Sequence, residues 1–477
     1  MTTSQLIVGP FNRVEGDLEI RLDVADGAVR AAYVNSPMFR GFERMLLGKG
    51  PIDALTITPR ICGICSISQS AAAARALAQA AGVVPAAQGE RVAALLHAVE
   101  NLADHVTHFN LFFMPDFARP DYAGAPWHDR AVARFTAMQG SALHVATDAR
   151  ARLLHIVGML GGKWPHTLAI QPGGVTRTPT RRDLIRIRAS LHAFRSYLET
   201  HLFGAEVEAF AALDSIDRLE EWHGGDAGLF LELSRDLGLA ASGLGTGRYL
   251  SFGAYPGPDG PLFARGIWTA DAGRGDLDTT GIAEDLSHAW MLGEDAHPTQ
   301  GQTLPDEAMA DPAYSWCKAP RLAGQSFETG ALARQIIDGH PLATELAREG
   351  SVRARIIGRL LEIARTQILL EQLLDRIDPE ATFMTPTELP EAGEGAGLVE
   401  AARGALGHWL RIENGKIASY QIIAPTTWNF SPRDKAGVPG PVEQALQGAP
   451  VRAGEDTPLS VQHIVRSFDP CMVCTVH

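Results

Sequence analysis

The sequence predicts an α+β protein that is mainly α-helical, with long central helices and small peripheral β-sheets. Several stretches of about 20 residues carry apolar side chains at helical spacing, which indicates amphipathic or buried helices. Two other segments alternate apolar and polar residues around turn residues, as β-hairpins do. Because no linker, block of like charge or internal repeat interrupts the chain, we expect one large domain over residues 1–477.

Long helices are predicted in five segments. The first contains the Ala-rich stretch SAAAARALAQAAG and stops at Gly82, since alanine favours helices and glycine commonly ends them. The second covers about residues 89–114 and ends before Pro115. The fifth is strongly amphipathic, with Arg and Glu on its polar side. The third, fourth and fifth helices cover about residues 140–160, 181–203 and 352–377.

Two β-hairpins are predicted, one towards each end of the chain. Within residues 5–36, DLEIRLDV alternates, ADG turns and AVRAAYV returns. The segment HWLRIENGKIASYQIIA turns at Asn414-Gly415, a dipeptide that favours tight hairpin turns. Loops are expected where neither pattern occurs, in residues 161–180, 251–261 and 303–321.

The composition argues against several classes of partner. The net charge of −13 and the pI of about 5.7 speak against nucleic acid and against docking on anionic lipid. No apolar stretch approaches the roughly 20 residues that span a bilayer, and the N-terminus lacks a basic segment followed by an apolar run. We therefore expect a cytoplasmic protein without a membrane span, although such a subunit can be exported with a partner that carries a signal.

The five cysteines form two Cys-x-x-Cys pairs and one isolated residue, Cys317. The pairs are Cys62 with Cys65 and Cys471 with Cys474, near opposite ends of the chain. Each pair places two sulfurs about one helical turn apart, and four thiolates suit zinc, nickel or an iron–sulfur cluster. A redox dithiol or half of a zinc ribbon would explain one pair alone. If both pairs share a metal ion, the two ends of the chain must meet in the fold.

The residues around the cysteines favour one of these interpretations. RICGICSISQ (residues 60–69) and DPCMVCTVH (residues 469–477) resemble the two signature motifs of the nickel–iron hydrogenase large subunit. Six further segments match the family's motifs in the expected order, so the resemblance runs the length of the chain and implies the family's fold. These segments are RVEGD (13–17), RGFE (40–43), GKWPH (162–166), YSWCKAPR (314–321), ARGALGHW (402–409) and APTTWNFSPRD (424–434).

The resemblance implies that all four paired cysteines bind a nickel–iron centre. Cys62 and Cys471 would be terminal nickel ligands, and Cys65 and Cys474 would bridge nickel to an iron that carries carbon monoxide and cyanide. The implied reaction is heterolytic cleavage of H2, in which the metals act as a Lewis acid and a base takes the proton.

Four further residues would surround this centre. Arg403 and Thr426 match the donors to the cyanides, and Arg403 would also lie over the open coordination site. Asp104 and Asp469 match the acids that orient Arg403 by pairing carboxylate with guanidinium. Without the resemblance, Arg403 would be interpreted as a surface arginine beside a turn.

The resemblance also implies routes for protons and electrons. Cys471 is the favoured base, with Arg403 as the competing candidate, and Glu15 matches the first carboxylate of the proton exit path. Without the resemblance, Glu15 would be a solvated acid at the start of a strand. A separate iron–sulfur small subunit is implied because Cys317 alone cannot hold a cluster; we expect Cys317 to serve packing.

A second, structural metal site, usually magnesium, is implied near the C-terminus. Glu43 and His477 match its side-chain ligands, and the backbone carbonyl of Ile422 would be the third protein ligand. The alternative for His477 is a frayed chain end.

Departures from the common family pattern narrow the subtype. Gln69 occupies a position where many family members have His, and Ile64 one where Val is frequent. Phe112 matches the position of a leucine in the gas channel, and Ala402 replaces the proline that usually precedes the arginine. Ile64 and Phe112, with Gln69 nearby in the motif, would form a gas gate that narrows the route to the metals. Together these residues resemble the regulatory, hydrogen-sensing branch, whose members tolerate oxygen, turn over slowly and report H2 to a histidine kinase.

The end of the chain at His477 would support the same branch if it is the end of the coding sequence, because that branch lacks the C-terminal peptide that most members lose on maturation. Three alternatives remain open from the sequence. They are an energy-converting uptake hydrogenase large subunit, a non-enzymatic zinc protein with a four-cysteine structural site, and a thiol–disulfide oxidoreductase that uses CGIC.

Overall fold

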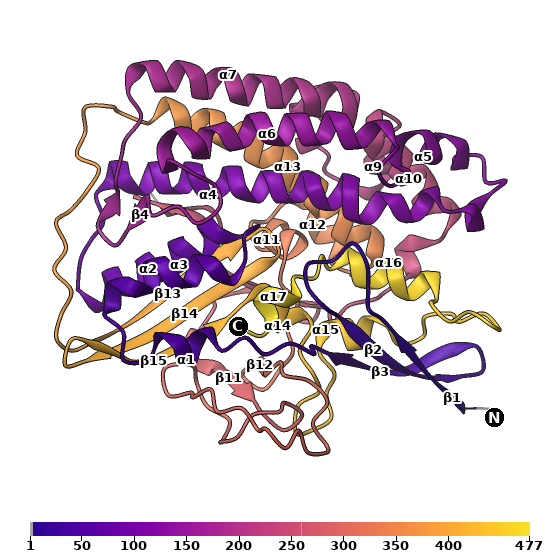
Figure 1. The fold of residues 1–477 in the computed structure, drawn as a ribbon. Helices are drawn as coiled ribbons and strands as arrows, with labels where there is room; N and C mark the ends of the chain where they lie inside the picture. The colour runs from indigo at the N-terminus through magenta and orange to yellow at the C-terminus, as the bar shows by residue number, and fades with distance from the viewer. Residues whose placement is uncertain (1–2, 259) are drawn as a thin grey trace.

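Four long helices contact one another in a layer on one side of the protein (Figure 1). The structure is a computed structural model and describes residues 3–258 and 260–477. The helices of this layer are α4 (Ala87–Thr107), α6 (Ser141–Gly161), α7 (Arg181–Tyr197) and α13 (Val352–Asp375). They occupy four of the five segments in which long helices were predicted, and with the small sheets they confirm the mainly helical α+β class.

Two of these helices continue in a wider helical form. After α4 the chain forms a π-helical segment, His108–Phe113, and then the 3₁₀ turn Met114–Ala118 that contains Pro115. After α7 a similar π-helical segment covers Leu198–Phe203. The periodicity of residues 89–114 and 181–203 therefore predicted the extent of the helical chain, but not the change of hydrogen-bond pattern within it. Such π-segments are rare and often lie at functional sites.

The polar side of α13 faces the interior, which corrects the expectation of an amphipathic helix. Arg355 donates to both carboxylate oxygens of Glu328, at 2.7 and 2.9 Å. Glu362 accepts from the guanidinium of Arg334 at 2.7 and 2.8 Å, and all four side chains are buried. The spacing of Arg and Glu in the sequence is typical of a helix face exposed to solvent. Here neighbouring elements supply opposite charges, which allow these side chains to be buried.

The β-sheets are small and antiparallel, and two of them contain the predicted hairpins. Each hairpin is extended by a third strand that the sequence did not reveal: β1 in the first sheet and β13 in the second. The Asn414-Gly415 turn has positive φ at both residues, 50° and 66°, as a tight primed turn requires. The two sheets consist of β1 (Thr3–Val8), β2 (Glu19–Ala25) and β3 (Ala28–Asn35), and of β13 (Gly393–Ala401), β14 (Gly404–Glu413) and β15 (Lys416–Ile423).

Helix α3 (Ser66–Ala80), the Ala-rich segment of the sequence, packs directly on strand β13. A Cβ atom added at Gly397 would lie 1.8 Å from the carbonyl oxygen of Ala72, and one at Gly395 would lie 2.0 Å from that of Ala76. The alanines recur every four residues on one helix face, and the glycines alternate on one strand face. Small side chains on both sides thus let the two backbones approach closely.

Shorter elements occupy the regions expected to be loops. The first predicted loop contains the two-stranded pair β4 (Ile170–Gln171) with β5 (Gly174–Val175), and the second contains β7 (Ala254–Gly257) and the beginning of its partner β8 (Gly260–Phe263). These strands are too short for alternation to be recognised. The other strands are β6 (Arg248–Ser251), β9 (Gly266–Thr269), β10 (Gly273–Gly275), β11 (Ile282–Asp285) and β12 (Ala319–Leu322).

Short helices connect the layer to the sheets. The helices of the middle of the chain are α5 (His128–Phe135), α8 (Val207–Ala211), α9 (Ile216–Glu220), α10 (Gly225–Asp236), α11 (Ala331–Ile337) and α12 (Pro341–Leu346). Those near the two ends are α1 (Phe42–Leu46), α2 (Ala54–Ile57), α14 (Pro425–Asn429), α15 (Pro441–Ala445), α16 (Leu459–Ser467) and α17 (Met472–Thr475). None of the helices in the described ranges combines the length and apolar character needed to cross a membrane.

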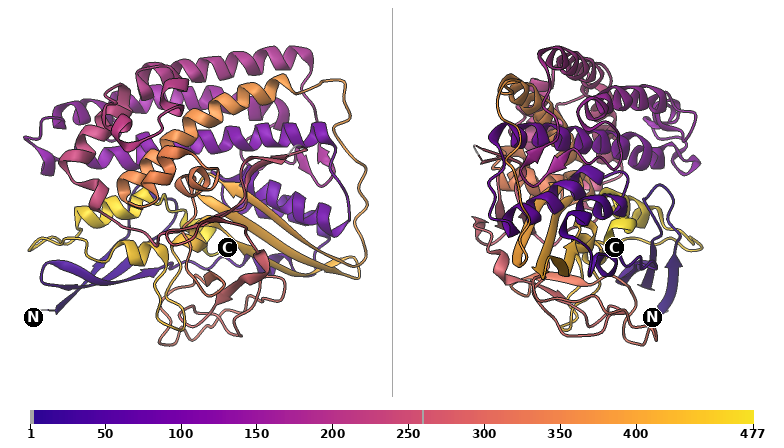
Figure 2. Two further views of the ribbon diagram at one scale, coloured as in Figure 1. Left: turned by 180° about the vertical axis from the view of Figure 1, so that it is seen from behind. Right: turned by 60° about the vertical axis from the view of Figure 1, so that its left-hand side comes forward.

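The C-terminal segment lies inside the protein rather than at its edge (Figure 2). The amide of Met472 donates to the carbonyl of Glu15 at 2.7 Å, and Glu15 and Cys471 form an isolated parallel β-bridge. The main buried hydrophobic cluster includes side chains from both chain ends, from Val8 to Cys474. The fold therefore brings the two ends together, as a shared metal site requires.

We predict that Gly397→Ala lowers the free energy of unfolding by about 1–3 kcal/mol or more, because the new methyl group would collide with the α3 backbone. Gly158→Ala is the matched control: it lies in α6 with nothing within 4 Å of its added Cβ, and it should stabilise the helix by up to about 1 kcal/mol. Thermal unfolding followed by circular dichroism measures both, and equal melting temperatures would contradict close α3–β13 packing.

Candidate metal centre

The four paired cysteines meet in one buried cluster. Their sulfur atoms all lie within 4.8 Å of one another. Cys62 Sγ is 3.6 Å from Cys471 Sγ, and Cys65 Sγ is 3.2 Å from Cys474 Sγ. Each contact therefore joins one cysteine from the start of the chain to one from its end. In the described ranges, this is the only cluster of at least three His, Cys, Asp or Glu side chains with the geometry to hold a metal ion.

The thiols of this cluster cannot all ionise in the protein alone. Hydrogen bonds from the thiols of Cys471, Cys474 and Cys65 hold the pKa of Cys62 well below its usual value. The hydrogen bond with Cys471 raises the pKa of Cys65 and of Cys474 well above theirs, and burial adds to the increase. One thiolate is thus stabilised at the expense of the others, so four thiolates at this distance require a cation. The donor set suits a soft metal such as nickel.

Polar side chains hold the two cysteine loops in place. The guanidinium of Arg40 donates to the carbonyl oxygens of Ile61 and Val473, one beside each cysteine pair. On the other side, Thr426 Oγ1 accepts from the amide of Cys471 at 3.1 Å. The Thr426 hydroxyl keeps its own hydrogen for donation, which is compatible with the predicted role of a donor to a bound ligand.

Glu15 lies beside the cluster. Its backbone pairs with the second cysteine loop, and its side chain is half-buried rather than free in solvent. Burial raises the pKa of the Glu15 carboxyl, the negative charge of Cys62 raises it further, and Arg403 opposes both. The alternative of a fully solvated acid at the start of a strand is therefore wrong.

Arg403 sits at the tip of the hairpin between β13 and β14, in the two-residue turn that it forms with Ala402. The guanidinium of Arg334 donates to the carbonyl oxygens of Ala401 and Ala402, at 2.9 and 2.8 Å. Gly404 has φ 132°, and a Cβ there would lie 2.2 Å from the Thr329 hydroxyl. The turn is thus held by Arg334 and by the close approach at Gly404, and it keeps its shape without the usual proline at Ala402.

The Arg403 guanidinium is buried between two carboxylates. It makes a fork with Asp104 at 2.7 and 3.1 Å, while its Nε donates to the backbone carbonyl of Asp469 at 3.0 Å. Nη2 lies 3.1 Å from the Asp469 carboxylate. Since the side chain is only 3% exposed, the alternative of a surface arginine is wrong. The orientation of Arg403 by Asp104 and Asp469 agrees with the sequence interpretation.

Asp104 and Asp469 share the Arg403 guanidinium, but their pKa values are shifted in opposite directions. Burial raises the pKa of Asp104 to about 7, against the attraction of Arg403. Burial also acts on Asp469, but there Arg403, helped by Arg359, holds the pKa at about 2. Arg359 Nη1 lies 3.1 Å from the Asp469 carboxylate and comes from the polar side of α13. That side of the helix therefore supports the site, a role that the sequence interpretation missed.

Glu43 and His477 lie together, as the predicted second metal site requires. His477 Nδ1 is 2.8 Å from the carbonyl oxygen of Cys474, which only accepts, so Nδ1 carries a hydrogen. His477 Nε2 then faces a Glu43 oxygen at 3.3 Å, and a proton or a cation must lie between two such acceptors. His477 is buried, so the alternative of a frayed end is wrong. The contact of Glu43 with Ile422 runs through the Ile422 amide, at 2.7 Å, rather than through its carbonyl.

Lys318 is a further member of this second site that the sequence interpretation did not single out. Its ammonium donates to Glu284 at 3.0 Å and lies 3.8 Å from Glu43. Burial would raise the pKa of Glu43, but Lys318 and His477 outweigh it and hold the pKa at about 2. The position of Lys318 inside YSWCKAPR was the available signal. Neighbouring Cys317 is buried and donates to the Lys318 carbonyl, as expected for a packing residue.

The three residues of the predicted gas gate lie on different elements. Ile64 is half-buried between the first two cysteines and packs against the main core. Phe112 is half-buried on the π-helical segment, and Arg13 donates to its carbonyl at 3.1 Å. Gln69 is buried in α3 and accepts from His408 at 2.8 Å, while His408 Nδ1 is 2.8 Å from the Tyr420 hydroxyl. Their action as a gate stays a prediction.

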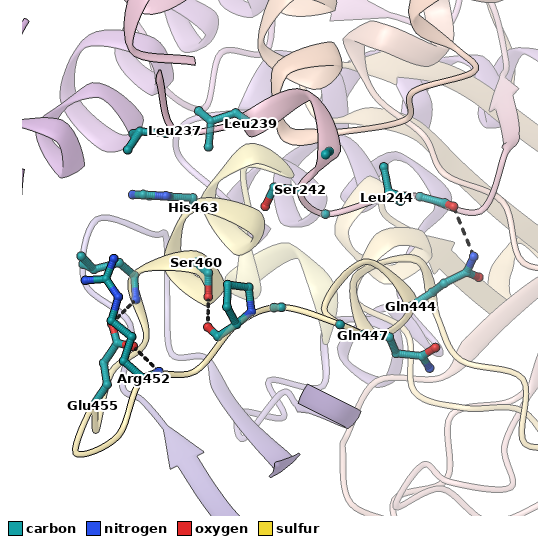
Figure 3. A pocket seen from close by; sticks show the side chains of 18 of the residues that line it. Leu237, Leu239, Ser242, Leu244, Gln444, Gln447, Arg452, Glu455, Ser460 and His463 are labelled. Atoms are coloured by element: carbon teal, nitrogen blue, oxygen red, sulfur yellow. Dashed lines mark hydrogen bonds between the residues drawn. The ribbon is translucent and has the colours of Figure 1, made fainter. Parts of the chain in front are cut away.

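A cleft of about 710 Å³ lies at the beginning of α16 and is not lined by any of the four cysteines (Figure 3). Apart from Tyr122, its lining residues come from segments 237–245 and 444–463. The side-chain amide of Gln444 joins these segments by donating to the Gly245 carbonyl at 3.2 Å. The cleft is therefore separate from the cysteine cluster.

Fold and site together define a protein that buries a four-cysteine site, suited to a soft metal, between its two chain ends. The family described as nickel-dependent hydrogenase matches residues 40–125 and 141–477. The chain belongs to this family of enzymes and corresponds to the large subunit of a hydrogenase.

Individual relatives agree with this assignment. The chain is 31% identical to the periplasmic [NiFeSe] hydrogenase large subunit of Desulfomicrobium baculatum, over 99% of this chain and 95% of that one. It is 26% identical to the uptake hydrogenase large subunit of Rhodobacter capsulatus, over 99% and 95%. A solved structure of the Desulfomicrobium baculatum [NiFeSe] hydrogenase has a TM-score of 0.86 and 29% identity, and the match covers 100% of both chains. Membership in this family removes the basis for the zinc protein and for the thiol–disulfide oxidoreductase.

We predict that Cys62→Ser or Cys471→Ser reduces bound nickel to about a tenth of the wild-type content or less, because a hydroxyl is a poor ligand for a soft metal. Cys317→Ser is the matched control and should keep its nickel, since Cys317 lies outside the cluster. Elemental analysis of the purified proteins measures nickel, iron and zinc. Full nickel content in the Cys62 and Cys471 variants would contradict the site.

Proposed function

We propose that this chain is the catalytic large subunit of a regulatory, hydrogen-sensing nickel–iron hydrogenase. The observation that carries the hydrogenase part of this proposal is the cluster of four buried thiols beside a buried arginine that is held by two carboxylates. The subunit would cleave H2 heterolytically, pass electrons to an iron–sulfur small subunit and signal through that complex to a histidine kinase.

The residues present fit a nickel–iron centre. Cys62 and Cys471 would hold nickel, while Cys65 and Cys474, whose sulfurs are 3.2 Å apart, would bridge to iron. When bound, the centre supplies Lewis acidity that polarises H2 and accepts its electrons. Iron-bound carbon monoxide and cyanide belong to the proposal, with the buried donors of Arg403 and Thr426 as their partners in the protein.

The proton has a favoured acceptor among the side chains. The pKa of Arg403 is raised well above its usual value: burial opposes the increase, but Asp104 and Asp469 outweigh it, so the guanidinium keeps its proton. A base must first be free of a proton, and Cys471 would lose its proton on binding a metal, so Cys471 is the better candidate of the two. Glu15, whose backbone is paired with Cys471, would then take the proton towards the surface.

The iron–sulfur small subunit follows from the need to remove electrons. The metal cluster uses four of the five cysteines, and Cys317 alone cannot hold an iron–sulfur cluster. Magnesium at Glu43 and His477 is also part of the proposal, supported by the facing acceptor atoms at 3.3 Å. A structural cation there would hold the C-terminal residue next to the carbonyl of Cys474.

The sensing role is supported by the bulky Ile64 and Phe112 and by Gln69, which depart from the common family pattern towards that of the regulatory branch. A sensing role would place the complex in the cytoplasm with its kinase. The second candidate is an energy-converting uptake hydrogenase, which the name of the Rhodobacter capsulatus relative favours. The rate of H2-dependent dye reduction separates the two, since a sensor turns over slowly.

We expect the complex with the small subunit to show sharp infrared bands in the region where metal-bound carbon monoxide and cyanide absorb and protein does not. The bands should shift when H2 is admitted, because the electronic state of the centre changes. Absence of the bands from a preparation that contains nickel and iron would contradict a diatomic-ligated centre in this chain.

We predict that the double variant Ile64→Val, Phe112→Leu loses activity in oxygen about tenfold faster than the wild type, which corresponds to a barrier lowered by about 1.4 kcal/mol. Smaller side chains would widen the route by which gas reaches the cluster. The control Ile64→Leu, Phe112→Tyr keeps the bulk and should resist oxygen like the wild type. H2-dependent dye reduction after timed exposure to air measures both, and an unchanged rate in the first variant would refute the gate.

A further inference from the structure

Glu100 is a buried carboxylate beside the cysteine cluster that the proposed reaction does not use. It belongs to α4, is 1% exposed, and faces the beginning of α3 just after Cys65. We propose that Glu100 is a positioning residue of the metal centre: its carboxylate caps α3 from a neighbouring helix and thereby fixes Cys65. This inference rests on the proposed metal-binding role of Cys65.

Five hydrogen-bond donors converge on this one carboxylate. The backbone amides of Ile67 and Ser68 donate at 2.9–3.0 Å. The hydroxyls of Ser66 and Ser68 donate at 3.2 Å, and Trp164 Nε1 donates at 3.0 Å. Both oxygens of Glu100 are therefore used, and both contact the first turn of α3.

Helix α3 needs such a partner because it has no cap of its own. The residue at its N-cap position is Cys65, whose side chain makes no capping hydrogen bond. The first amides of a helix lack partners within the helix, and they carry the positive end of its dipole. An ordinary cap residue such as Ser or Asp at this position would occupy the place of the metal ligand. Glu100 supplies the missing acceptor, so that the Cys65 sulfur remains free to face the other thiols.

The same carboxylate ties α3 to the loop that contains GKWPH. Besides the bond from Trp164, the amide of His166 donates to Ser66 Oγ at 3.3 Å, and His166 Nδ1 is 2.9 Å from the carbonyl oxygen of Pro59. Pro59 lies just before the first cysteine motif. The first cysteine pair is thus held on both sides by groups that converge on Glu100 and Ser66.

Helix α4 supports both cysteine pairs from one face. Asp104 follows Glu100 by four residues and therefore lies on the same side of the helix. Asp104 holds Arg403, which also contacts Asp469 next to the second pair, whereas Glu100 holds the helix that begins after the first pair. Burial raises the pKa of both acids, Asp104 to about 7 and Glu100 to about 8, and the donors that each one faces oppose this: a guanidinium in the first case and a helix N-terminus in the second.

We test this inference with Glu100→Gln in the complex with the small subunit. The glutamine keeps the size of the side chain but turns one acceptor oxygen into an N–H₂ group that faces N–H donors. We expect the carbon monoxide and cyanide bands to shift, and hydrogen exchange of the Ile67 and Ser68 amides to accelerate at least about tenfold, which corresponds to about 1.4 kcal/mol of lost protection. Trp164→Phe removes a single donor and should shift the bands in the same direction by less.

Glu90→Gln is the matched control, because Glu90 is also an acid of α4 that contacts α3, through Arg75 at 3.2 Å, but away from the cysteines. It should leave the bands unchanged. Unaltered bands and unaltered exchange in Glu100→Gln would overturn the inference. If Glu100→Gln does not accumulate, identical bands in Trp164→Phe and the wild type would overturn it equally. Absence of the bands from the wild type itself would instead count against the proposed function.

Discussion

The mutual repulsion of four thiolates in a site buried from solvent is the constraint on which the rest of the structure depends. Sulfur atoms within 4.8 Å of one another and buried from solvent cannot all be ionised unless a cation compensates them. Such a site has to be held together by the protein until the metal is bound. Because Cys62 and Cys474 stand near opposite ends of the chain, the fold must first bring those ends into contact.

Buried charges outside the cluster provide that support. Arg359 links Asp469 to the central helix α13, and its Nη1 also donates to His105 on α4 at 2.8 Å. His105 in turn contacts Glu362, which pairs with Arg334. Buried ion pairs are seldom a net source of stability, since desolvation offsets their attraction. Their benefit here is geometric: each charge has defined partners, and the Arg403 turn and the second cysteine loop are both attached to this network.

Close packing of the α3 and β13 backbones fixes the distance between the first cysteine pair and Arg403. The glycines of β13 let α3 approach the strand so closely that neither can slide along the other without collision. Helix α3 begins at the first cysteine pair, and β13 leads into the turn that carries Arg403. The distance between the first pair and the arginine is therefore set by contacts between small residues, which explains why an Ala-rich helix and a Gly-rich strand accompany a metal site.

The sequence by itself determined the features that depend on neighbours along the chain. Helical periodicity predicted α4, α6, α7 and α13, and the Asn414-Gly415 turn predicted a hairpin. The motifs around Cys62 and Cys471 identified the family and predicted that the four paired cysteines lie together. Tertiary structure alone decided which polar groups are inside. Glu100 and the arginines of α13 look like solvated helix residues, because the partners that allow their burial lie far away in the sequence and no local pattern reveals them.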